Sequence, residues 1–287
     1  MLSPPGASHK PGMNSIEETT CVILAGGQGK RMASADLHKV CFPILGRAAI
    51  VRAVDTYKAA GLKRFLVVVG QMADQVIATL TAEHPEVSFV YQSRPLGTGH
   101  AAAVAARALA AQGYEGPVMI VMGDKITRPQ VVRRMFDRYS RGDAEMVLAT
   151  LDKQASPGSG RVVTDHAGQV LGVVEAADVK RARQTGKKVP LCGRRLSAAR
   201  IEQASPTVNA SLYVCRFDAL NDALARLDSD NAQGEIYLTD AVEEFARRGG
   251  AVSELVRDPS DLMAYNTPAE LMAVEAAVRA RQRAVRV

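Results

Sequence analysis

Three glycines and two cations lie close together in the stretch VILAGGQGKRM, near the start of the chain. In order they are Gly26, Gly27, Gly29, Lys30 and Arg31. Bare backbone can approach an anion closely and point its N–H groups at it, and an arginine can bind two phosphate oxygens at once. Because an apolar run precedes the glycines, we expect them to follow a buried strand. The combination predicts a loop that wraps the phosphates of a nucleotide, and the competing interpretation is a plain glycine turn.

Two common phosphate-binding fingerprints do not match this loop. A dinucleotide fingerprint requires G-x-G-x-x-G, and here Met32 stands where the third glycine belongs. The next apolar run, RFLVVVGQ, also lacks the acidic residue that would bind a ribose. A P-loop requires G-x-x-x-x-G-K-[ST], but Leu24 replaces its first glycine and Arg31 replaces its hydroxyl residue. A nicotinamide-dependent oxidoreductase is therefore disfavoured, and a phosphate-wrapping loop of another kind is favoured.

Further polar residues end or follow the later apolar runs. Asp124 ends PVMIVMGD, and an aspartate at the carboxyl end of a strand suits Mg²⁺, which prefers hard oxygens and few protein ligands. Gln92 ends VSFVYQ, where its amide can pair with the edge of a pyrimidine base. Gly97 lets the backbone approach a ring, and we expect Thr98 to cap the helix that follows. His100 is interpreted as a structural residue without a role in proton transfer.

These groups must be positioned by secondary structure. In the first half of the chain, strand-like and helix-like patterns alternate and would provide it. Short apolar runs typical of buried strands span residues 21–26, 64–70, 87–92, 117–124 and 144–151. Patterns with helical spacing lie between them, over residues 48–61, 71–80, 99–113 and 128–142. This alternation predicts an α/β fold with a Rossmann-like, mixed but mainly parallel sheet covered by helices. Ligands of such sheets bind beyond the carboxyl ends of the strands, which is where the glycines, Gln92 and Asp124 fall.

The pattern changes in the second half of the chain. It predicts a hairpin over residues 160–176, a polar and basic segment over 178–206 and a strand over 207–217. These are followed by a helix over residues 218–227, a loop running into a helix over 231–250, a strand over 251–256 and a last helix over 266–285. No internal repeat or clean linker divides the chain. We therefore expect one domain over residues 19–287 that carries an inserted lobe, preceded by a flexible tail over residues 1–18.

Composition and charge argue against several classes of protein. The 287 residues carry a net charge of +6 and four cysteines without metal-ligand spacing. No apolar run approaches the roughly 18 residues that span a bilayer, and no signal-peptide core is present, so we expect a cytoplasmic protein without a membrane partner. The excess cations gather in residues 180–195 and 278–287 without interleaved aromatic residues. We interpret them as solvated faces rather than nucleic-acid sites, and the sequence leaves open whether the chain forms a homo-oligomer.

Nine stretches follow one another in an informative order between Cys21 and Leu271. They are LAGGQGKRM, HKVCFPILGRAAIVRAV, YQSRPLGTGHAAAVA, VMGD, GSGRVV, GVVEAADV, TVNASLY, NAQGEIYLTD and AYNTPAEL. In order and spacing they resemble the sugar-phosphate nucleotidyltransferase family, most closely the uridylyltransferase (pyrophosphorylase) domains of bifunctional N-acetylglucosamine-1-phosphate uridyltransferases. The resemblance implies a Mg²⁺-dependent reaction between a nucleoside triphosphate and a sugar-1-phosphate that releases pyrophosphate. It favours UTP and N-acetylglucosamine-1-phosphate, which would give UDP-N-acetylglucosamine.

The resemblance also implies roles for particular residues. The catalytic residues would be Arg31, Lys39 and Asp124. The nucleotide would be bound by Leu24, Ala25, Gly26, Gly27, Gly29, Lys30, Gln92, Gly97 and Thr98. The sugar and its phosphate would be bound by Gly160, Glu175, Asn209, Tyr237 and Thr239. Mg²⁺ would be bound by Asp124 and Asn266, although Asn266 by itself could be only the cap of the last helix.

Two departures from the family pattern leave the substrate open. Lys125 directly follows Asp124, where the uridyltransferases have a small apolar residue. The segment over residues 178–206 is longer and more basic than its counterpart and borders the sugar residues. Thymidylyl, cytidylyl or guanylyl transfer to another sugar phosphate remains an alternative. A non-catalytic sensor of nucleotide sugars is a different class, against which the presence of Arg31, Lys39 and Asp124 favours catalysis.

Overall fold

The computed structural model describes residues 15–27, 29–32, 34 and 36–284, so most of the predicted tail lies outside the described residues. The strands are β1 (Thr20–Ala25), β2 (Pro43–Ile44), β3 (Arg47–Ala48), β4 (Arg64–Val69), β5 (Ser88–Tyr91), β6 (Val118–Met122), β7 (Lys125–Thr127), β8 (Met146–Asp152), β9 (Arg161–Thr164), β10 (Val170–Val174), β11 (Val189–Leu191), β12 (Arg194–Leu196), β13 (Thr207–Cys215), β14 (Ala251–Leu255) and β15 (Leu262–Ala264). The α-helices are α1 (Ala49–Ala60), α2 (Ala73–Thr81), α3 (Thr98–Ala111), α4 (Pro129–Tyr139), α5 (Ala176–Thr185), α6 (Ala198–Gln203), α7 (Phe217–Leu224), α8 (Asp240–Ala246) and α9 (Pro268–Ala284). The 3₁₀ helices are η1 (Lys30–Met32), η2 (Lys39–Cys41) and η3 (Pro259–Asp261).

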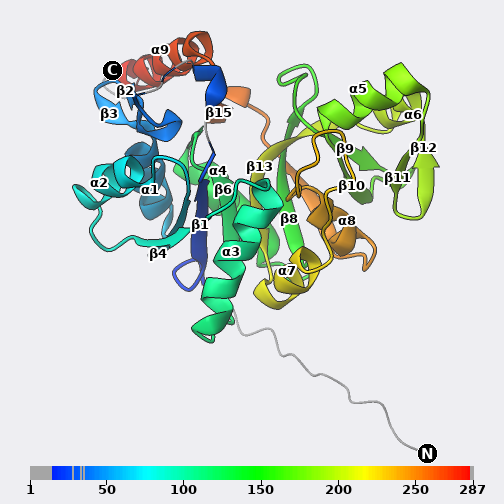
Figure 1. Ribbon diagram of the computed structural model, residues 1–287, viewed down its shortest axis with the longest axis horizontal. Coiled ribbons are helices and arrows are strands. Elements are labelled where there is room, and N and C mark those ends of the chain that lie inside the picture. Colours follow the sequence, from blue (N-terminus) through cyan, green and yellow to red (C-terminus); the bar gives the residue numbers. More distant parts are fainter. Residues whose placement is uncertain (1–14, 28, 33, 35, 285–287) are drawn as a thin grey trace, which may run out of the picture.

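A mixed sheet runs through the molecule, which confirms the predicted fold class (Figure 1). Its strands are ordered β10-β9-β13-β6-β1-β4-β5, and β8 and β14 continue from β13. The strands β6, β1, β4 and β5 are parallel, because helices return the chain between them. Strand β13 enters antiparallel between β6 and β8, and beyond it β14 pairs parallel with β8.

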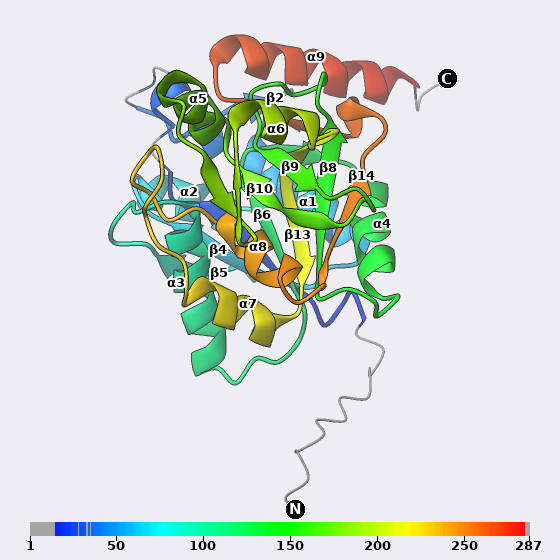
Figure 2. The same ribbon diagram turned by 90° about the vertical axis from the view of Figure 1, so that its right-hand side faces the viewer.

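Helices cover both faces of this sheet, as expected for parallel strands that are buried throughout. Every residue of β1 is buried. Helices α1, α2 and α4 contribute to the core on one face, and α3, α7 and α8 contribute to the core on the other. Helix α3 lies in front of the sheet in Figure 1, and α7 and α8 lie on the side of the sheet that faces the viewer in Figure 2. Each face is thus shielded from water, and the loops at the strand ends remain free to bind ligands.

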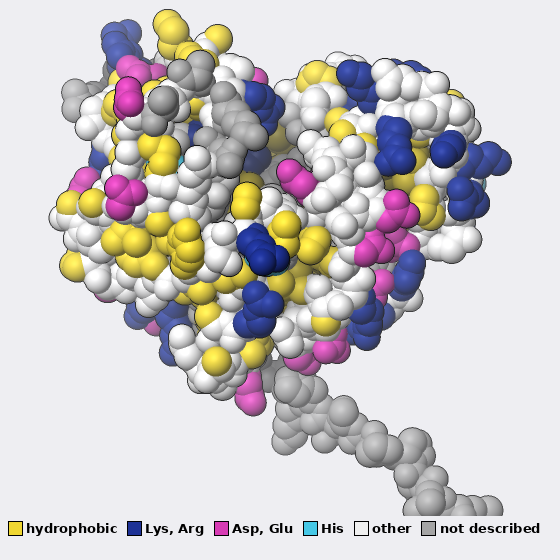
Figure 3. Space-filling view, viewed as in Figure 1, with side chains coloured by type: hydrophobic (Ala, Val, Ile, Leu, Met, Phe, Trp, Pro, Cys, Tyr) yellow, Lys and Arg dark blue, Asp and Glu magenta, His cyan; other side chains and the backbone are white. Residues whose placement is uncertain are grey.

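The hairpin β9–β10 was predicted, and it leads into an inserted lobe of α5, the pair β11–β12, and α6. The segment over residues 178–206 is therefore folded rather than only polar. A small core holds it together, and the buried residues of this core include Val179, Leu191 and Ile201. Lys and Arg side chains gather over this lobe at the right of Figure 3. The lobe stands apart from α9, and the space-filling view is notched between them.

Helix α9 crosses the other side of that notch, at the top left of Figure 1. It packs on β2 and β15 through a separate apolar cluster that contains Ile44, Tyr265 and Val274. Strand β15 pairs antiparallel with β7, directly after Asp124 in the sequence. This pairing brings the residues before α9 to the end of β6. In the described part of the chain, no helix has both the length and the apolar character needed to cross a membrane.

Candidate active site

A cavity of about 600 Å³ lies at the carboxyl ends of β1, β5 and β6. Of the expected nucleotide-binding residues, those on its wall are Leu24, Ala25, Gly26, Gly27, Gly29, Gln92, Gly97 and Thr98. The expected catalytic residues Arg31, Lys39 and Asp124 line the same cavity, and so does Asn266. Only the backbone of Lys30 is described, within η1. Residues that lie more than 200 positions apart in the sequence are thus gathered around one space.

The glycine loop is contacted by His38, to which sequence reasoning gave no role. The Nε2–H of His38 donates to the carbonyl oxygen of Gly27 (3.0 Å), and its Nδ1 accepts the N–H of Val40 (3.3 Å). Burial lowers the pKa of this histidine, which matches the neutral ring that both bonds require. Gly29 has φ of 57°, a conformation that glycine adopts without strain. This contact ties Gly27 to a side chain outside the loop, and the loop glycines Gly26, Gly27 and Gly29 line the cavity.

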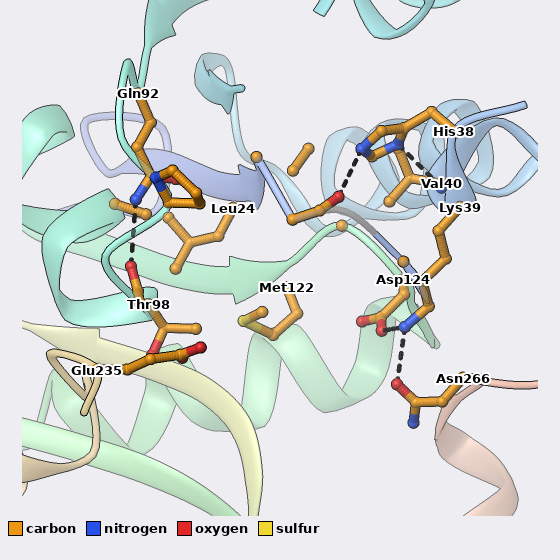
Figure 4. A pocket seen from close by; sticks show the side chains of 18 of the residues that line it. Leu24, His38, Lys39, Val40, Gln92, Thr98, Met122, Asp124, Glu235 and Asn266 are labelled. Carbon is orange, nitrogen blue, oxygen red and sulfur yellow. Dashed lines mark hydrogen bonds and ion pairs between the residues drawn. The ribbon is translucent and has the colours of Figure 1, made fainter. Parts of the chain in front are cut away.

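Lys39, Asp124 and Asn266 form the charged centre of the cavity (Figure 4). The Nζ of Lys39 forms an ion pair with Asp124 and donates to Oδ1 of Asn266 at 2.9 Å. The same Oδ1 accepts from Nη2 of Arg31 at 2.8 Å. The Tyr265 ring supports Lys39 from beneath, with its centroid 5.5 Å from Nζ. Both side chains of the ion pair are largely buried, so the two charges interact more strongly than they would at the surface.

The donor set around Asp124 fits a divalent cation. Oδ1 of Asp124 is buried and has no hydrogen-bond partner among the described residues. An unpartnered carboxylate oxygen is costly to bury, and a bound cation would remove that cost. Within the described part of the chain, no three His, Cys, Asp or Glu side chains are grouped to hold a metal. A site of one carboxylate and one amide oxygen would suit Mg²⁺, which keeps waters and takes other ligands from phosphates.

Asn266 was interpreted either as a metal ligand or as a helix cap. In the structure its side chain contacts Lys39 and Arg31, while the hydroxyl of Thr267 accepts the N–H of Glu270 at 3.2 Å. The expected cap of α9 at Asn266 is therefore wrong, because Thr267 takes that bond. This leaves the Asn266 side chain at the charged centre.

Gln92 lies at the other end of the cavity, where a base would be read. It is buried, and its Nε2 donates to the carbonyl oxygen of Gly97 at 3.2 Å and to Nδ1 of His100 at 3.0 Å. Burial, followed by the charge of Arg107, lowers the pKa of His100, which favours a neutral ring that can accept this bond. His100 therefore orients Gln92, in agreement with the structural role expected for it.

The expected capping role of Thr98 is wrong. Helix α3 begins at Thr98 itself, and the preceding Gly97 has no side chain with which to cap it. The hydroxyl of Thr98 instead accepts the N–H of Leu238 at 3.1 Å. A side chain at Gly97, where φ is 112°, would meet the carbonyl oxygen of Ile236 at 2.5 Å. Tertiary contact with this distant loop, rather than helix capping, therefore determines both residues.

The expected sugar residues are connected to one another, but they do not line the nucleotide cavity. Thr239 donates to Oε1 of Glu175 at 2.9 Å, and the N–H of Asn209 donates to the carbonyl oxygen of Gly160 at 2.8 Å. A side chain at Gly160 would meet Oε2 of Glu175 at 3.2 Å. Tyr237 is buried and donates to Oε1 of Gln233 at 2.8 Å. Gly160, Glu175, Asn209 and Thr239 thus form one group, whereas the hydroxyl of Tyr237 bonds to Gln233.

Sequence reasoning gave no role to several residues on the cavity wall, among them Met122, Gln233 and Glu235. Met122 lies two residues before Asp124 and extends into the middle of the space between the base end and the charged centre (Figure 4). Gln233 and Glu235 come from the loop before Tyr237. They lie in the quoted stretch NAQGEIYLTD, so the signal was present, but nothing local indicates that this loop meets α3.

Lys125 lies in β7 and lines a second cavity of about 560 Å³. The second cavity shares Met122, Asp124 and Asn266 with the nucleotide cavity, so the two spaces adjoin at the charged centre. Burial lowers the pKa of the Lys125 ammonium, which the charge of Asp124 opposes. Lys125 therefore lines a cavity rather than extending freely into solvent.

Acidic residues gather on a third cavity, of about 360 Å³, between the inserted lobe and α8. Burial, followed by the charges of Glu175 and Asp178, raises the pKa of Asp240 from 3.8 to about 7. A raised carboxyl pKa means that the folded protein favours the protonated acid. The cost of ionising Asp240 therefore grows as the pH rises from about 4 to about 7, and it is fully present above that range.

We expect Asp240→Asn to stabilise the protein at alkaline pH, because the amide cannot ionise. The free energy of unfolding should rise by on the order of 2 kcal/mol at pH 8, and the gain should vanish near pH 4. Urea unfolding at both pH values measures it, with the exposed Asp137→Asn as the control that changes neither value. A gain of equal size at pH 4 and pH 8 would contradict ionisation of Asp240 in this range.

The sequence matches the family described as the MobA-like NTP transferase domain over residues 21–210. It is 36% identical over 268 residues to the bifunctional protein GlmU of Geobacter metallireducens, covering 93% of this chain and 51% of that protein. It is 34% identical over 265 residues to the bifunctional protein GlmU of Sorangium cellulosum, covering 89% of this chain and 51% of that protein. The chain thus spans about half the length of these curated relatives.

Two solved structures share the fold at 17% sequence identity. One is a UDP-glucose pyrophosphorylase complexed with UDP-glucose, with a TM-score of 0.65 over 92% of this chain and 99% of that one. The other is a Bacillus anthracis protein assigned as a glucose-1-phosphate thymidylyltransferase, with a TM-score of 0.68 over 91% of this chain and 95% of that one. At this identity the likeness bears on the fold alone.

Proposed function

The chain belongs to the family of MobA-like NTP transferases, and from this premise we propose that it transfers a nucleotidyl group from a nucleoside triphosphate to a sugar-1-phosphate, with release of pyrophosphate. One observation carries the proposal. The charged centre of Lys39, Asp124 and Asn266 lies on the wall of the same cavity as the glycine loop. Backbone amides, cations and a carboxylate for a metal are what transfer between two phosphate groups requires.

No nucleophile from the protein is needed for this reaction. An oxygen of the sugar phosphate forms a bond to the α-phosphorus, and the bond from that phosphorus to the bridging oxygen of the β-phosphate breaks. Pyrophosphate leaves with the electron pair, and because the attacking phosphate is already an anion, no proton has to be removed from it. The two substrates are anions that repel each other, so the residues of the chain must hold them in the geometry for in-line attack. They must also stabilise the charge on the leaving group.

The residues of the cavity divide this task. The amides of the glycine loop and the guanidinium of Arg31 would hold the β- and γ-phosphates. Lys39 and Asp124 neutralise each other in the structure. When a triphosphate and its cation bind, the phosphates would become the partner of Lys39 and the cation would become the partner of Asp124. Asp124 and Asn266 would hold Mg²⁺, which supplies charge neutralisation to the phosphate oxygens.

UTP and N-acetylglucosamine-1-phosphate are the favoured substrates. They are supported by the resemblance to the uridylyltransferase domains and by 32–36% identity to bifunctional GlmU proteins. The folded basic lobe beside Glu175 and the cation at Lys125 differ from the family pattern and bear on the sugar. Thymidylyl, cytidylyl or guanylyl transfer to another sugar phosphate is the alternative within this chemistry, and a nucleotide-sugar sensor is the alternative outside it.

Pyrophosphate release tests the proposal directly. Purified protein with Mg²⁺ is combined with ATP, GTP, CTP, UTP or dTTP and with a panel of sugar-1-phosphates, and the variant Asp124→Asn serves as the inactive control. Release with UTP and N-acetylglucosamine-1-phosphate is the expected result. Release with another pair would retain the chemistry and correct the substrates, whereas nucleotide binding without release for any pair would contradict catalysis and support the sensor.

We expect Gln92→Ala to weaken base recognition without removing catalysis. The change deletes the buried amide beside Gly97 and His100, so the KM for the triphosphate should rise roughly tenfold. The enzyme should also discriminate less among the bases of the triphosphate. Comparison of kcat/KM for UTP, dTTP and CTP measures the effect, and Gln112→Ala at the exposed end of α3 is the matched control. An unchanged ratio among the three bases would show that another residue reads the ring.

A further inference from the structure

Lys125 lines the second cavity, and its ammonium has no counter-charge at bonding distance. Among the residues that the structure describes, none forms a hydrogen bond or ion pair with it. Lys39 differs from Lys125 in this respect, because Lys39 contacts Asp124, Asn266 and the Tyr265 ring. Lysines removed from bulk water are normally paired. The unpaired cation therefore indicates that an anionic group from a ligand belongs in this cavity.

The walls of the second cavity suit a small polyhydroxylated phosphate. Its polar lining residues include Ser156, Ser159, Asn209, Ser211, Ser260 and Glu270. One of them is placed by an irregularity of the sheet: the register of β13 shifts between Asn209 and Tyr213, and Ser211 there has φ of 56°. Such irregularities redirect side chains and recur next to binding sites. Asn209 also connects this cavity to the expected sugar residues.

The position of the cavity matches the side from which the acceptor must attack. In an in-line displacement the nucleophile and the leaving group lie on opposite sides of the phosphorus. The glycine loop, which would hold the leaving pyrophosphate, lines only the first cavity. The second cavity meets the first at Asp124 and Asn266 and contains none of these glycines. A phosphate group next to Lys125 would thus reach the charged centre from the side away from the glycine loop.

We propose that Lys125 binds the phosphate group of the acceptor in the second cavity and thereby recruits a monosaccharide phosphate to the charged centre. This inference rests on the proposed nucleotidyl transfer, because it assigns the acceptor side of that reaction. The ammonium neutralises one of two anions that would otherwise repel each other. Lys125 is therefore a binding residue for the acceptor and contributes little to binding of the triphosphate.

Kinetics of three variants test this assignment. We expect Lys125→Met, which keeps the shape without the charge, to raise the KM for the sugar-1-phosphate by roughly 10- to 100-fold and to leave the KM for the triphosphate within about twofold. Lys125→Arg should retain most of the acceptor affinity. Lys63→Met, at an exposed lysine near the start of β4, is the control. Equal acceptor KM values in wild type and Lys125→Met would overturn the proposal.

The reverse reaction and a binding measurement separate the other outcomes. If Lys125→Met raised the KM for pyrophosphate instead, Lys125 would hold the leaving group and the acceptor assignment would be wrong. If wild type released no pyrophosphate with any pair, the proposed function would fail, and calorimetric titration with inorganic phosphate would still test Lys125. An affinity at least about fivefold weaker in Lys125→Met than in wild type supports the phosphate site, and equal affinities, or no binding by wild type, contradict it.

Discussion

Asp124→Asn should reduce kcat by roughly 1,000-fold and leave a folded protein. The change removes the carboxylate charge whose Oδ1 is buried without a partner, and an asparagine oxygen binds Mg²⁺ much more weakly. The rate of pyrophosphate release is measured across a range of Mg²⁺ concentrations, and we expect the apparent Mg²⁺ requirement to rise along with the loss of rate. Circular dichroism checks that secondary structure is retained.

A matched control distinguishes the loss of the Asp124 carboxylate from the effect of a changed net charge. Asp222→Asn removes a carboxylate from the exposed face of α7 and should leave kcat unchanged. If Asp124→Asn had full activity with Mg²⁺, Asp124 would not be a metal ligand. If both variants lost activity equally, the effect would reflect net charge rather than the charged centre.

Lys39→Met should lower kcat/KM for the triphosphate by roughly 100-fold, because a charge-assisted contact to phosphate disappears from a largely buried site. The same change leaves Asp124 without its ion-pair partner. Breaking a buried pair by removing one member is destabilising, so we expect the free energy of unfolding to fall by about 2–3 kcal/mol. Steady-state kinetics and urea unfolding measure the two effects separately.

The double variant Lys39→Met with Asp124→Asn separates stability from catalysis. Removing both charges leaves no unpaired ion, so the double variant should regain most of the stability lost by Lys39→Met, while activity stays at the level of Asp124→Asn. The exposed pair of Lys63 and Glu17 is the control, since disrupting it should cost less than about 1 kcal/mol. Additive losses of stability in the double variant would show that Lys39 and Asp124 do not compensate each other.

The sequence predicted the scaffold well because the relevant signals are local. Buried strands such as β1 appear as short apolar runs, and α1 ends at Gly61 in the left-handed conformation that glycine favours. The hairpin β9–β10 followed from its turn. The polar segment at residues 178–206 was harder, because its small core uses a few widely spaced apolar residues. Periodicity and backbone freedom are properties of neighbouring residues, so they can be read without the fold.

The sequence by itself thus determined the α/β pattern, the glycine loop, and the presence of Gln92 and Asp124 at strand ends. Tertiary structure alone decided that Asn266 meets Lys39 across 227 positions, that Thr98 bonds Leu238 rather than capping α3, and that Lys125 faces a second cavity. These contacts depend on the order of strands in the sheet and on the pairing of β7 with β15. A local pattern reports which face of an element is buried, but it carries no information about which distant segment will cover that face.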